Sequence, residues 1–156
     1  MLHSLRQRTS DEGGFTLIEL LVVILIIGIL AAIAIPALLS QKSKAYDSSA
    51  KTVAQTAQTA AETLATENNG SYSAVSQSEL NKIEPSLNTS NANEAELTEA
   101  KEIESGGGYK VVATAQNTGD EFTVQRKANG VVEHLCASTK GTKTGCPGHS
   151  AASSSW

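Results

Sequence analysis

An uninterrupted apolar run near the amino terminus constrains this chain more than any other feature. The sixteen residues from Leu20 to Ile35 include none that is charged or strongly polar, and the run extends to Leu39 as twenty residues. At a helical rise of about 1.5 Å per residue, twenty residues cover roughly 30 Å, the thickness of the hydrocarbon core of a bilayer. Apolar side chains lie on every side of such a helix, so it must be in lipid or enclosed by other protein.

The segment before this run is polar. Residues 1–14 read MLHSLRQRTSDEGG and end in the pair Gly13-Gly14. A secretory signal has its apolar region before the cleavage site, whereas here the glycine pair precedes the apolar region. Cleavage after Gly14 would therefore leave the apolar helix on the mature chain. An uncut membrane anchor with a cytoplasmic tail is the alternative interpretation.

Three residues distinguish the apolar run from an ordinary membrane span. Glu19 places a carboxylate at its amino end, Gly28 lies near its middle, and Pro36 lies late in it. An ionised group in a membrane segment is costly and needs a partner once apolar neighbours exclude water. Pro36 lacks the N–H that would bond to the carbonyl of Ala32, and glycine lowers helix stability by about 1 kcal/mol relative to alanine. We therefore expect the helix to be weakest over 28–36 and to bend, without ending, at Pro36.

The order and spacing of these residues resemble the class III signal of type IV prepilins and pseudopilins. The matching residues are Gly14, Phe15, Thr16, Leu17, Ile18 and Glu19, followed by the apolar run with Gly28 and Pro36. The resemblance implies that a prepilin peptidase cuts between Gly14 and Phe15 and methylates the new amine of Phe15. It also implies that this amine and Glu19 neutralise each other between adjacent subunits. A Glu19 carboxylate that snorkels to the lipid interface is the alternative.

An amphipathic segment continues the helix beyond the apolar run. Small apolar residues recur in it at spacings of three and four, namely Ala50, Val53, Ala54, Ala57, Ala61, Leu64 and Ala65. We expect one helix from Phe15 to Asn68, ended by Asn68-Asn69-Gly70, with the small apolar stripe facing a sheet.

Three strand-like runs follow in the carboxyl-terminal half. Apolar and polar residues alternate over 109–116, 122–125 and 131–137, and short turns containing glycine separate these runs. Two helical turns are expected earlier, at 78–83 and at 93–103, and the glutamates of the second turn are interpreted as a solvated face. The sequence therefore predicts an α+β fold in which a long amino-terminal helix packs against a small three-stranded antiparallel sheet.

These patterns divide the 156 residues into four segments. The first is a leader at 1–14 that is removed, and the second is a transmembrane or filament-core helix at 15–39. An amphipathic helix of the head follows at 40–68, and a globular head occupies 69–156. This length suffices for one small domain besides the helix.

The two cysteines, Cys136 and Cys146, lie near the carboxyl end. A membrane-tethered domain outside the cytoplasm is expected to pair its cysteines, and the loop would be similar to the carboxyl-terminal disulfide loop of many pilins. A zinc site formed with His134 and His149 is the less favoured alternative, so we expect no bound metal and no cofactor. The pattern leaves open whether Trp156 packs on the head or forms an exposed contact.

The net charge of −4 argues against nucleic acid as the main partner. Five basic residues fall in the predicted sheet and tail, namely Lys110, Arg126, Lys127, Lys140 and Lys143. We interpret them as solubilising residues, with a basic face that grips DNA as the alternative. No nucleophile elbow, paired metal motif or nucleotide-binding fingerprint is recognisable, so we do not expect an enzyme.

The resemblance implies a pilin, a structural subunit that polymerises through its amino-terminal helix into an extracellular filament. Such filaments serve adhesion, twitching motility or DNA uptake. The implied partners are further copies of the chain, the prepilin peptidase and N-methyltransferase, and a pilus assembly platform with its ATPase. The precursor is expected to cross the inner membrane once. A pseudopilin of a type II secretion or DNA-uptake machine is the second interpretation, and a membrane-anchored binding or enzyme domain that never polymerises is the third.

Overall fold

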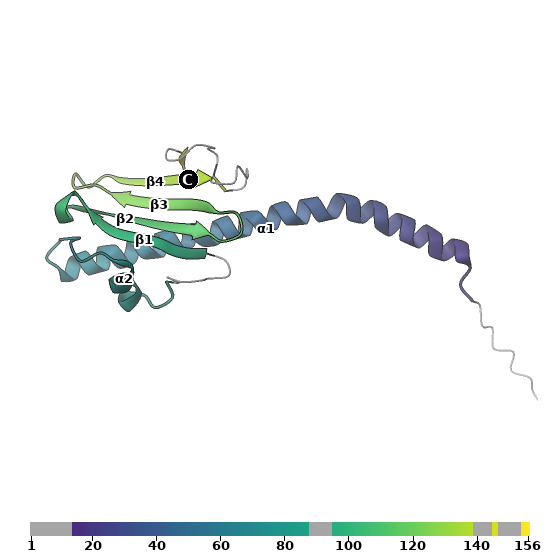
Figure 1. Cartoon of the computed structure of the whole chain (residues 1–156), viewed down its shortest axis with the longest axis horizontal. Coiled ribbons are helices and arrows are strands. Elements are labelled where there is room, and N and C mark those ends of the chain that lie inside the picture. Colours follow the sequence, from purple (N-terminus) through teal and green to yellow (C-terminus); the bar gives the residue numbers. More distant parts are fainter. Residues whose placement is uncertain (1–13, 88–94, 139–144, 147–153) are drawn as a thin grey trace, which may run out of the picture. The chain divides into compact units, whose positions relative to one another are not determined.

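Helix α1 (Leu17–Glu67) is the longest element of the chain. The computed structural model describes residues 14–87, 95–138, 145–146 and 154–156. Its further elements are, in chain order, α2 (Gln77–Ile83), β1 (Ala95–Ile103), the short 3-10 helix η1 (Glu104–Gly106), β2 (Gly108–Ala115), β3 (Asp120–Arg126), β4 (Val132–Ser138) and β5 (Ser154–Ser155) (Figure 1). The chain divides into two compact units, Met1–Leu38 and Leu39–Trp156. We call the second unit the head.

The bounds of α1 confirm the prediction of one helix from Phe15 to Asn68, with Pro36 inside it. The helix ends because Asn69 and Gly70 adopt left-handed backbone conformations, with φ of 53° and 85°. The N–H of Gly70 donates to the carbonyl of Ala65 at 2.7 Å, which satisfies one of the last helical carbonyls. Glycine takes this conformation without the steric cost that other residues pay.

The five strands form one antiparallel sheet in the order β1-β2-β3-β4-β5. The three predicted strands correspond to β2, β3 and β4. The predicted sheet of three strands has too few strands. Strand β1 adds a full strand on one side, and the two-residue β5 pairs with Leu135 and Cys136 on the other.

The predicted helical turn at 93–103 is wrong, because residues Ala95–Ile103 form strand β1. The segment is rich in Glu, Ala and Lys, which favour helix locally, but the open edge of β2 offers it a hydrogen-bond ladder and cross-strand partners. Lys110 of β2 donates to Glu99 of β1 at 2.8 Å. Residues 93 and 94 lie outside the described residues.

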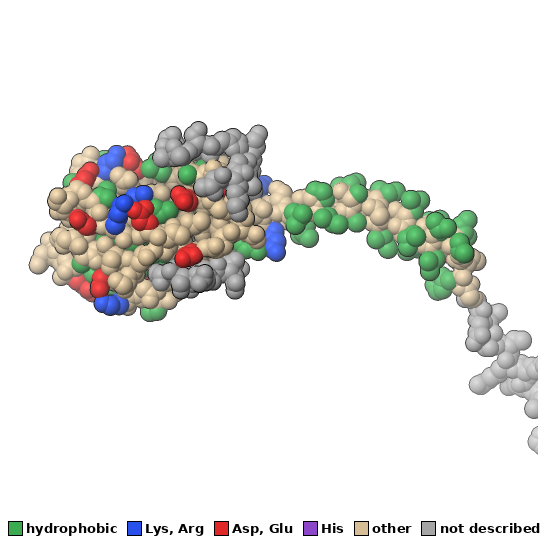
Figure 2. Space-filling model, viewed as in Figure 1, with side chains coloured by type: hydrophobic (Ala, Val, Ile, Leu, Met, Phe, Trp, Pro, Cys, Tyr) green, Lys and Arg blue, Asp and Glu red, His purple; other side chains and the backbone are tan. Residues whose placement is uncertain are grey.

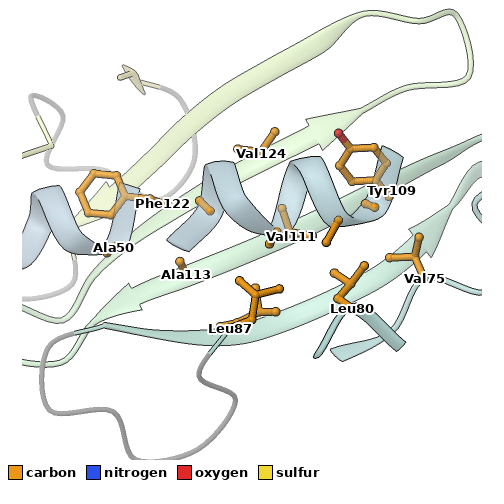
Figure 3. Close-up of a cluster of buried hydrophobic side chains, with 14 of the residues drawn as sticks. Ala50, Val75, Leu80, Leu87, Tyr109, Val111, Ala113, Phe122 and Val124 are labelled. Carbon is orange, nitrogen blue, oxygen red and sulfur yellow. The ribbon is translucent and has the colours of Figure 1, made fainter. Parts of the chain in front are cut away.

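The head has one core between the sheet and the carboxyl-terminal half of α1. Small side chains come from the helix, which buries Ala50, Ala54, Ala57, Ala60, Ala61 and Ala65. Larger ones come from the sheet, where Tyr109, Val111, Phe122 and Val124 point towards the helix (Figure 3). The alanines let the sheet approach the helix closely, as the predicted stripe of small residues requires.

Helix α2 closes one side of this core. It was predicted at 78–83, and it begins after Ser76, whose side chain accepts a hydrogen bond from the N–H of Glu79 at 3.3 Å. Leu80 of α2 and Leu87 beyond it are buried against the sheet (Figure 3). The side chain of Gln77 donates to the carbonyl of Leu97 at 2.7 Å, so α2 is also tied to strand β1.

A half-buried polar cluster joins the end of α1 to the sheet. Glu62 of α1 accepts hydrogen bonds from the hydroxyls of Tyr72 at 2.7 Å and Tyr109 at 3.1 Å. The Arg126 guanidinium lies 3.6 Å from the same carboxylate. Burial and the neighbouring Glu62 charge raise the pKa of Tyr109 above its ordinary value, and burial and the Glu62 hydrogen bond raise that of Tyr72.

Candidate functional site

Glu19 and Thr16 form a capping box at the amino end of α1. The N–H and hydroxyl of Thr16 donate to the same carboxylate oxygen, Oε2 of Glu19, at 2.9 and 2.8 Å. In return, the N–H of Glu19 donates to the Thr16 hydroxyl oxygen at 3.2 Å. The pair therefore satisfies two backbone N–H groups that the first turn of a helix otherwise leaves without partners.

The capping role of Thr16 is the functional feature that the sequence-based prediction missed. The signal was present, because a threonine followed three residues later by a glutamate, just before an apolar run, is typical of a capping box. From the sequence, Glu19 was expected to be a membrane carboxylate that needs a partner from another subunit. In the single chain, its partner is Thr16.

Gly14 and Phe15 precede the helix and belong to no helix or strand. Phe15 is 89% exposed, and a side chain added at Gly14 would meet no atom within 4 Å. Among the described residues, no atom crowds Gly14, and the Phe15 side chain packs against little of the chain. Gly13 and the rest of the leader lie outside the described residues.

The segment from Leu17 to Leu39, which contains Glu19 and the apolar run, is exposed except at the half-buried Ala31. Its large hydrophobic side chains are between 48% and 79% exposed. Figure 2 shows these side chains along the helix of the first unit. Among the described residues, α1 is the one helix long and apolar enough to cross a membrane. Such a surface is unstable in water and requires lipid or other protein to cover it.

Gly28 opens a shallow apolar hollow on this helix, and Pro36 lies within the helix without ending it. The hollow is lined by Leu21, Ile24, Leu25, Gly28, Ile29 and Ala32. A Cβ added to Gly28 would meet nothing within 4 Å in the single chain. Glycine therefore has no packing role inside the subunit here, and its small size is relevant to whatever packs against the helix.

The amino-terminal residues match a known sequence motif. Residues 9–35 match the family model of the prokaryotic N-terminal methylation motif. These residues carry that methylation motif, which is the class III signal peptide of type IV pilins and pseudopilins. The match spans the leader end, Glu19 and the apolar run, so it supports a type IV pilin-like protein or pseudopilin, a class whose members are structural subunits. No curated protein and no solved structure matches the chain.

The head contains a disulfide between Cys136 and Cys146. It ties the end of β4 to the segment around Gly145. That glycine lies so close to α1 that an added Cβ would be 2.5 Å from the Cβ of Asp47. Because both sulfurs are used in the disulfide, they are not available as thiolate ligands of zinc. His149, the remaining member of the alternative zinc set, lies outside the described residues.

Trp156 packs on the head, which answers the question that the sequence left open. Its indole N–H donates to the carbonyl of Leu135 at 2.8 Å. The ring makes edge contacts with Phe122 and His134, with centroids 5.7 and 4.9 Å apart. The Lys51 ammonium lies 5.4 Å from its centre. These contacts hold β5 against the edge of the sheet.

The basic residues of the sheet are paired with acidic ones. Lys110 lies 2.8 Å from Glu99, Lys127 lies 2.6 Å from Glu133, and Arg126 lies beside Glu62. Such pairing neutralises the positive field that DNA binding requires. Lys140 and Lys143, the other two basic residues considered, lie outside the described residues.

Proposed function

We propose that this chain is the structural subunit of a type IV pilus, cut after Gly14 and polymerised through α1 into an extracellular filament. The observation that supports this proposal most strongly is the bare apolar helix with a carboxylate at its start. The helix exposes large hydrophobic side chains throughout, and Glu19 lies in its first turn. Such a surface is unstable in water, so in this proposal it is covered first by lipid and then by neighbouring helices.

Assembly then proceeds in stages. The leader keeps the precursor in the inner membrane with its helix across the bilayer. A prepilin peptidase cuts between Gly14 and Phe15 and methylates the new amine. The helix leaves lipid for an equally apolar filament core, so hydrophobic burial is kept and close helix packing supplies the association energy. A pilus assembly platform and a cytoplasmic ATPase are the further partners in this proposal.

Glu19 sets the register between subunits in this account. Both side-chain and backbone donors of Thr16 bind Oε2, which leaves Oε1 for a partner in another subunit. The new Phe15 amine of a neighbouring copy is a cation that becomes buried when helices enclose it. Pairing with Glu19 offsets the cost of that burial.

Filament yield from Glu19 variants tests the proposal. Cells with a complete assembly machinery would express the wild type, Glu19→Ala, or the control Glu67→Ala, which removes an exposed carboxylate at the other end of α1. An unpaired buried charge costs about 3–5 kcal/mol, which is roughly a hundredfold or more in association. We therefore expect Glu19→Ala to be processed but to yield few sheared filaments by electron microscopy, and Glu67→Ala to assemble normally.

In the same experiment, the location of the processed chain distinguishes a pilus subunit from a pseudopilin. Filaments outside the cell support the pilus. Processed chain that stays in the periplasm and depends on Glu19 would support a pseudopilin instead. Abundant filaments from Glu19→Ala, or membrane protein that keeps its leader, would contradict the proposed assembly.

A further inference from the structure

A short basic segment of α1 directly follows the apolar run. Lys42 and Lys44 lie three and five residues beyond Leu39, and both are exposed. The Lys42 ammonium lies over the ring of Tyr46, 5.7 Å from its centre. We call Lys42, Lys44 and Tyr46 the basic collar.

The collar lysines differ from the other basic residues that the structure describes in the head. Lys51 lies over the rings of Phe122 and Trp156. The rest form ion pairs with glutamates, namely Lys82, Lys101, Lys110, Arg126 and Lys127. Within the described parts of the chain, neither Lys42 nor Lys44 is in an ion pair. The cations without an acidic partner are therefore those next to the apolar run.

The acid that follows the collar in the sequence is directed into the head. Asp47 is 1% exposed and accepts a hydrogen bond from the Thr118 hydroxyl at 2.5 Å. The next acid along α1 is Glu62, which accepts from two tyrosines. The collar thus presents two positive charges on a chain whose net charge is −4.

The position of the collar along α1 matches the depth of phospholipid headgroups. When Leu20–Leu39 spans the hydrocarbon core, Lys42 and Lys44 lie about 4–8 Å beyond its edge. The headgroup layer is roughly 5–8 Å thick on each side. Tyr46 starts further out, but helical side chains lean towards the amino terminus, so its ring extends back towards this layer. Lysine and tyrosine both favour such an interface, because each has an apolar body and a polar tip.

The side of the membrane on which the collar lies also indicates a partner. Lysines beside a membrane span favour the cytoplasmic side, where the leader already has Arg6 and Arg8. In the proposed function the collar is on the opposite side, so its charges weaken the orientation signal. Lys42 and Lys44 are about 200° apart around the helix, and therefore point in opposite directions. Lipid surrounds a membrane helix on all sides, whereas one protein partner covers a single side.

We infer that the basic collar binds the headgroup phosphates of anionic phospholipids, on the side of the membrane opposite the leader. The inference rests on the membrane stage of the proposed function. Lysine ammonium groups donate to phosphate oxygens, and cations beside a membrane span are attracted to an anionic lipid surface. This binding fixes the depth of α1 in the bilayer before assembly.

Lipid retention by the full-length chain tests the inference. The chain is reconstituted in bilayers of equal parts phosphatidylglycerol and phosphatidylcholine, released in mild detergent, and weighed intact with its bound lipids. We expect the wild type to retain phosphatidylglycerol over phosphatidylcholine at least about fivefold, because two lysines act together on the anionic lipid. The double variant Lys42→Gln/Lys44→Gln should retain both lipids about equally.

Two matched variants separate charge from other effects. Lys42→Arg/Lys44→Arg keeps both charges and should keep the preference for phosphatidylglycerol. Lys82→Gln/Lys101→Gln removes two exposed charges elsewhere on the head and should keep it too. All substituted side chains are exposed, so every variant should insert and retain the Cys136–Cys146 disulfide.

The outcomes distinguish the inference from the proposed function. Inserted wild-type chain that retains both lipids equally, or an unchanged preference in Lys42→Gln/Lys44→Gln, would overturn the inference and leave the proposed function standing. Wild-type chain that does not insert into the bilayer would contradict the membrane stage, and the inference would fail with it.

A photo-reactive residue in place of Ala45, which is exposed between Lys44 and Tyr46, identifies the occupant directly. In the same bilayers, illumination should join position 45 mainly to phosphatidylglycerol. Position 117, at an exposed turn of the head, should form much less of this product. Products of position 45 that are mainly with phosphatidylcholine or with a second copy of the chain would overturn the inference.

Discussion

At the scale of single residues, Glu19 has Thr16 as its partner in the structure and acquires a second partner in the proposed filament. In the single chain the carboxylate caps α1 through Thr16, with both donors on one oxygen. In the proposed filament the other oxygen meets the amine of a neighbouring Phe15. The cap keeps the carboxylate at the first turn of the helix, which is the position that the proposed pairing requires.

Removal of the Thr16 hydroxyl should loosen the first turn of α1. Loss of a threonine N-cap costs about 1 kcal/mol, which corresponds to roughly fivefold in the local opening equilibrium. In Thr16→Val we expect the amides of Glu19 and Leu20 to exchange with solvent about fivefold faster, measured by NMR on the chain in detergent micelles. Thr16→Ser keeps the hydroxyl and should exchange like the wild type. Equal exchange in all three chains would contradict the capping role.

Tyr109 should make the head less stable at alkaline pH. Its pKa is raised in the folded chain by burial and by Glu62, whereas an unfolded tyrosine titrates near pH 10. Above about pH 10 the unfolded chain therefore releases a proton that the folded chain retains, and the free energy of unfolding falls as pH rises. Thermal unfolding between pH 7 and 11 should show this loss of stability.

Replacement of Tyr109 by phenylalanine provides the comparison. Tyr109→Phe should cost about 1.5–3 kcal/mol at pH 7, because it removes a hydrogen bond to a charged group. The same variant should lose less stability than the wild type between pH 9 and 11. Tyr46→Phe lies outside the Glu62 cluster and should keep the wild-type pH dependence. Parallel pH profiles for Tyr109→Phe and the wild type would exclude Tyr109 as the cause.

At the scale of elements, the parts with a repeated local pattern could be predicted from the sequence. The bounds of α1 follow from its apolar run, its stripe of alanines and its Asn-Gly end. Strands β2, β3 and β4 follow from alternation and turns. Strand β1 could not be recognised in this way, because its Glu, Ala and Lys residues favour helix and its strand state depends on the edge of β2.

Contacts between distant parts of the chain were also beyond sequence reasoning. Glu62 and Tyr109 are 47 positions apart, and no local pattern relates them. Trp156 meets Phe122 and Lys51 only because the sheet and α1 bring those residues together. The residues of the candidate site, in contrast, could be predicted from the sequence. Gly14, Phe15 and Glu19 could be singled out in advance because a signal read by a peptidase is a linear pattern.

The Cys136–Cys146 disulfide should contribute substantially to the stability of the head. The two cysteines are 10 positions apart, and the disulfide fixes the end of β4 beside Asp47 and Gly145. Replacement of both cysteines by serine should lower the free energy of unfolding by about 2–4 kcal/mol. Urea titration of the processed chain in detergent measures this loss. Wild-type chain treated with reductant should shift by a similar amount, and an unchanged midpoint in either case would contradict the role assigned to the disulfide.

At the scale of the whole molecule, the two compact units have different surfaces. The first unit exposes an apolar helix, whereas the head buries its own core. A subunit whose head has its own core, and whose amino-terminal helix lacks cover for its apolar side chains, is suited to polymerisation. In the proposed function, its apolar surface is covered by lipid before assembly and by other copies afterwards.

The central claim is that this helix enters a filament only after the leader has been removed. The mass of the intact chain, measured on filaments sheared from cells, tests it most directly. We predict a chain that begins at Phe15, carries one added methyl group on its amine, and retains the Cys136–Cys146 disulfide. Chains recovered from filaments with residues 1–14 still attached would contradict the account.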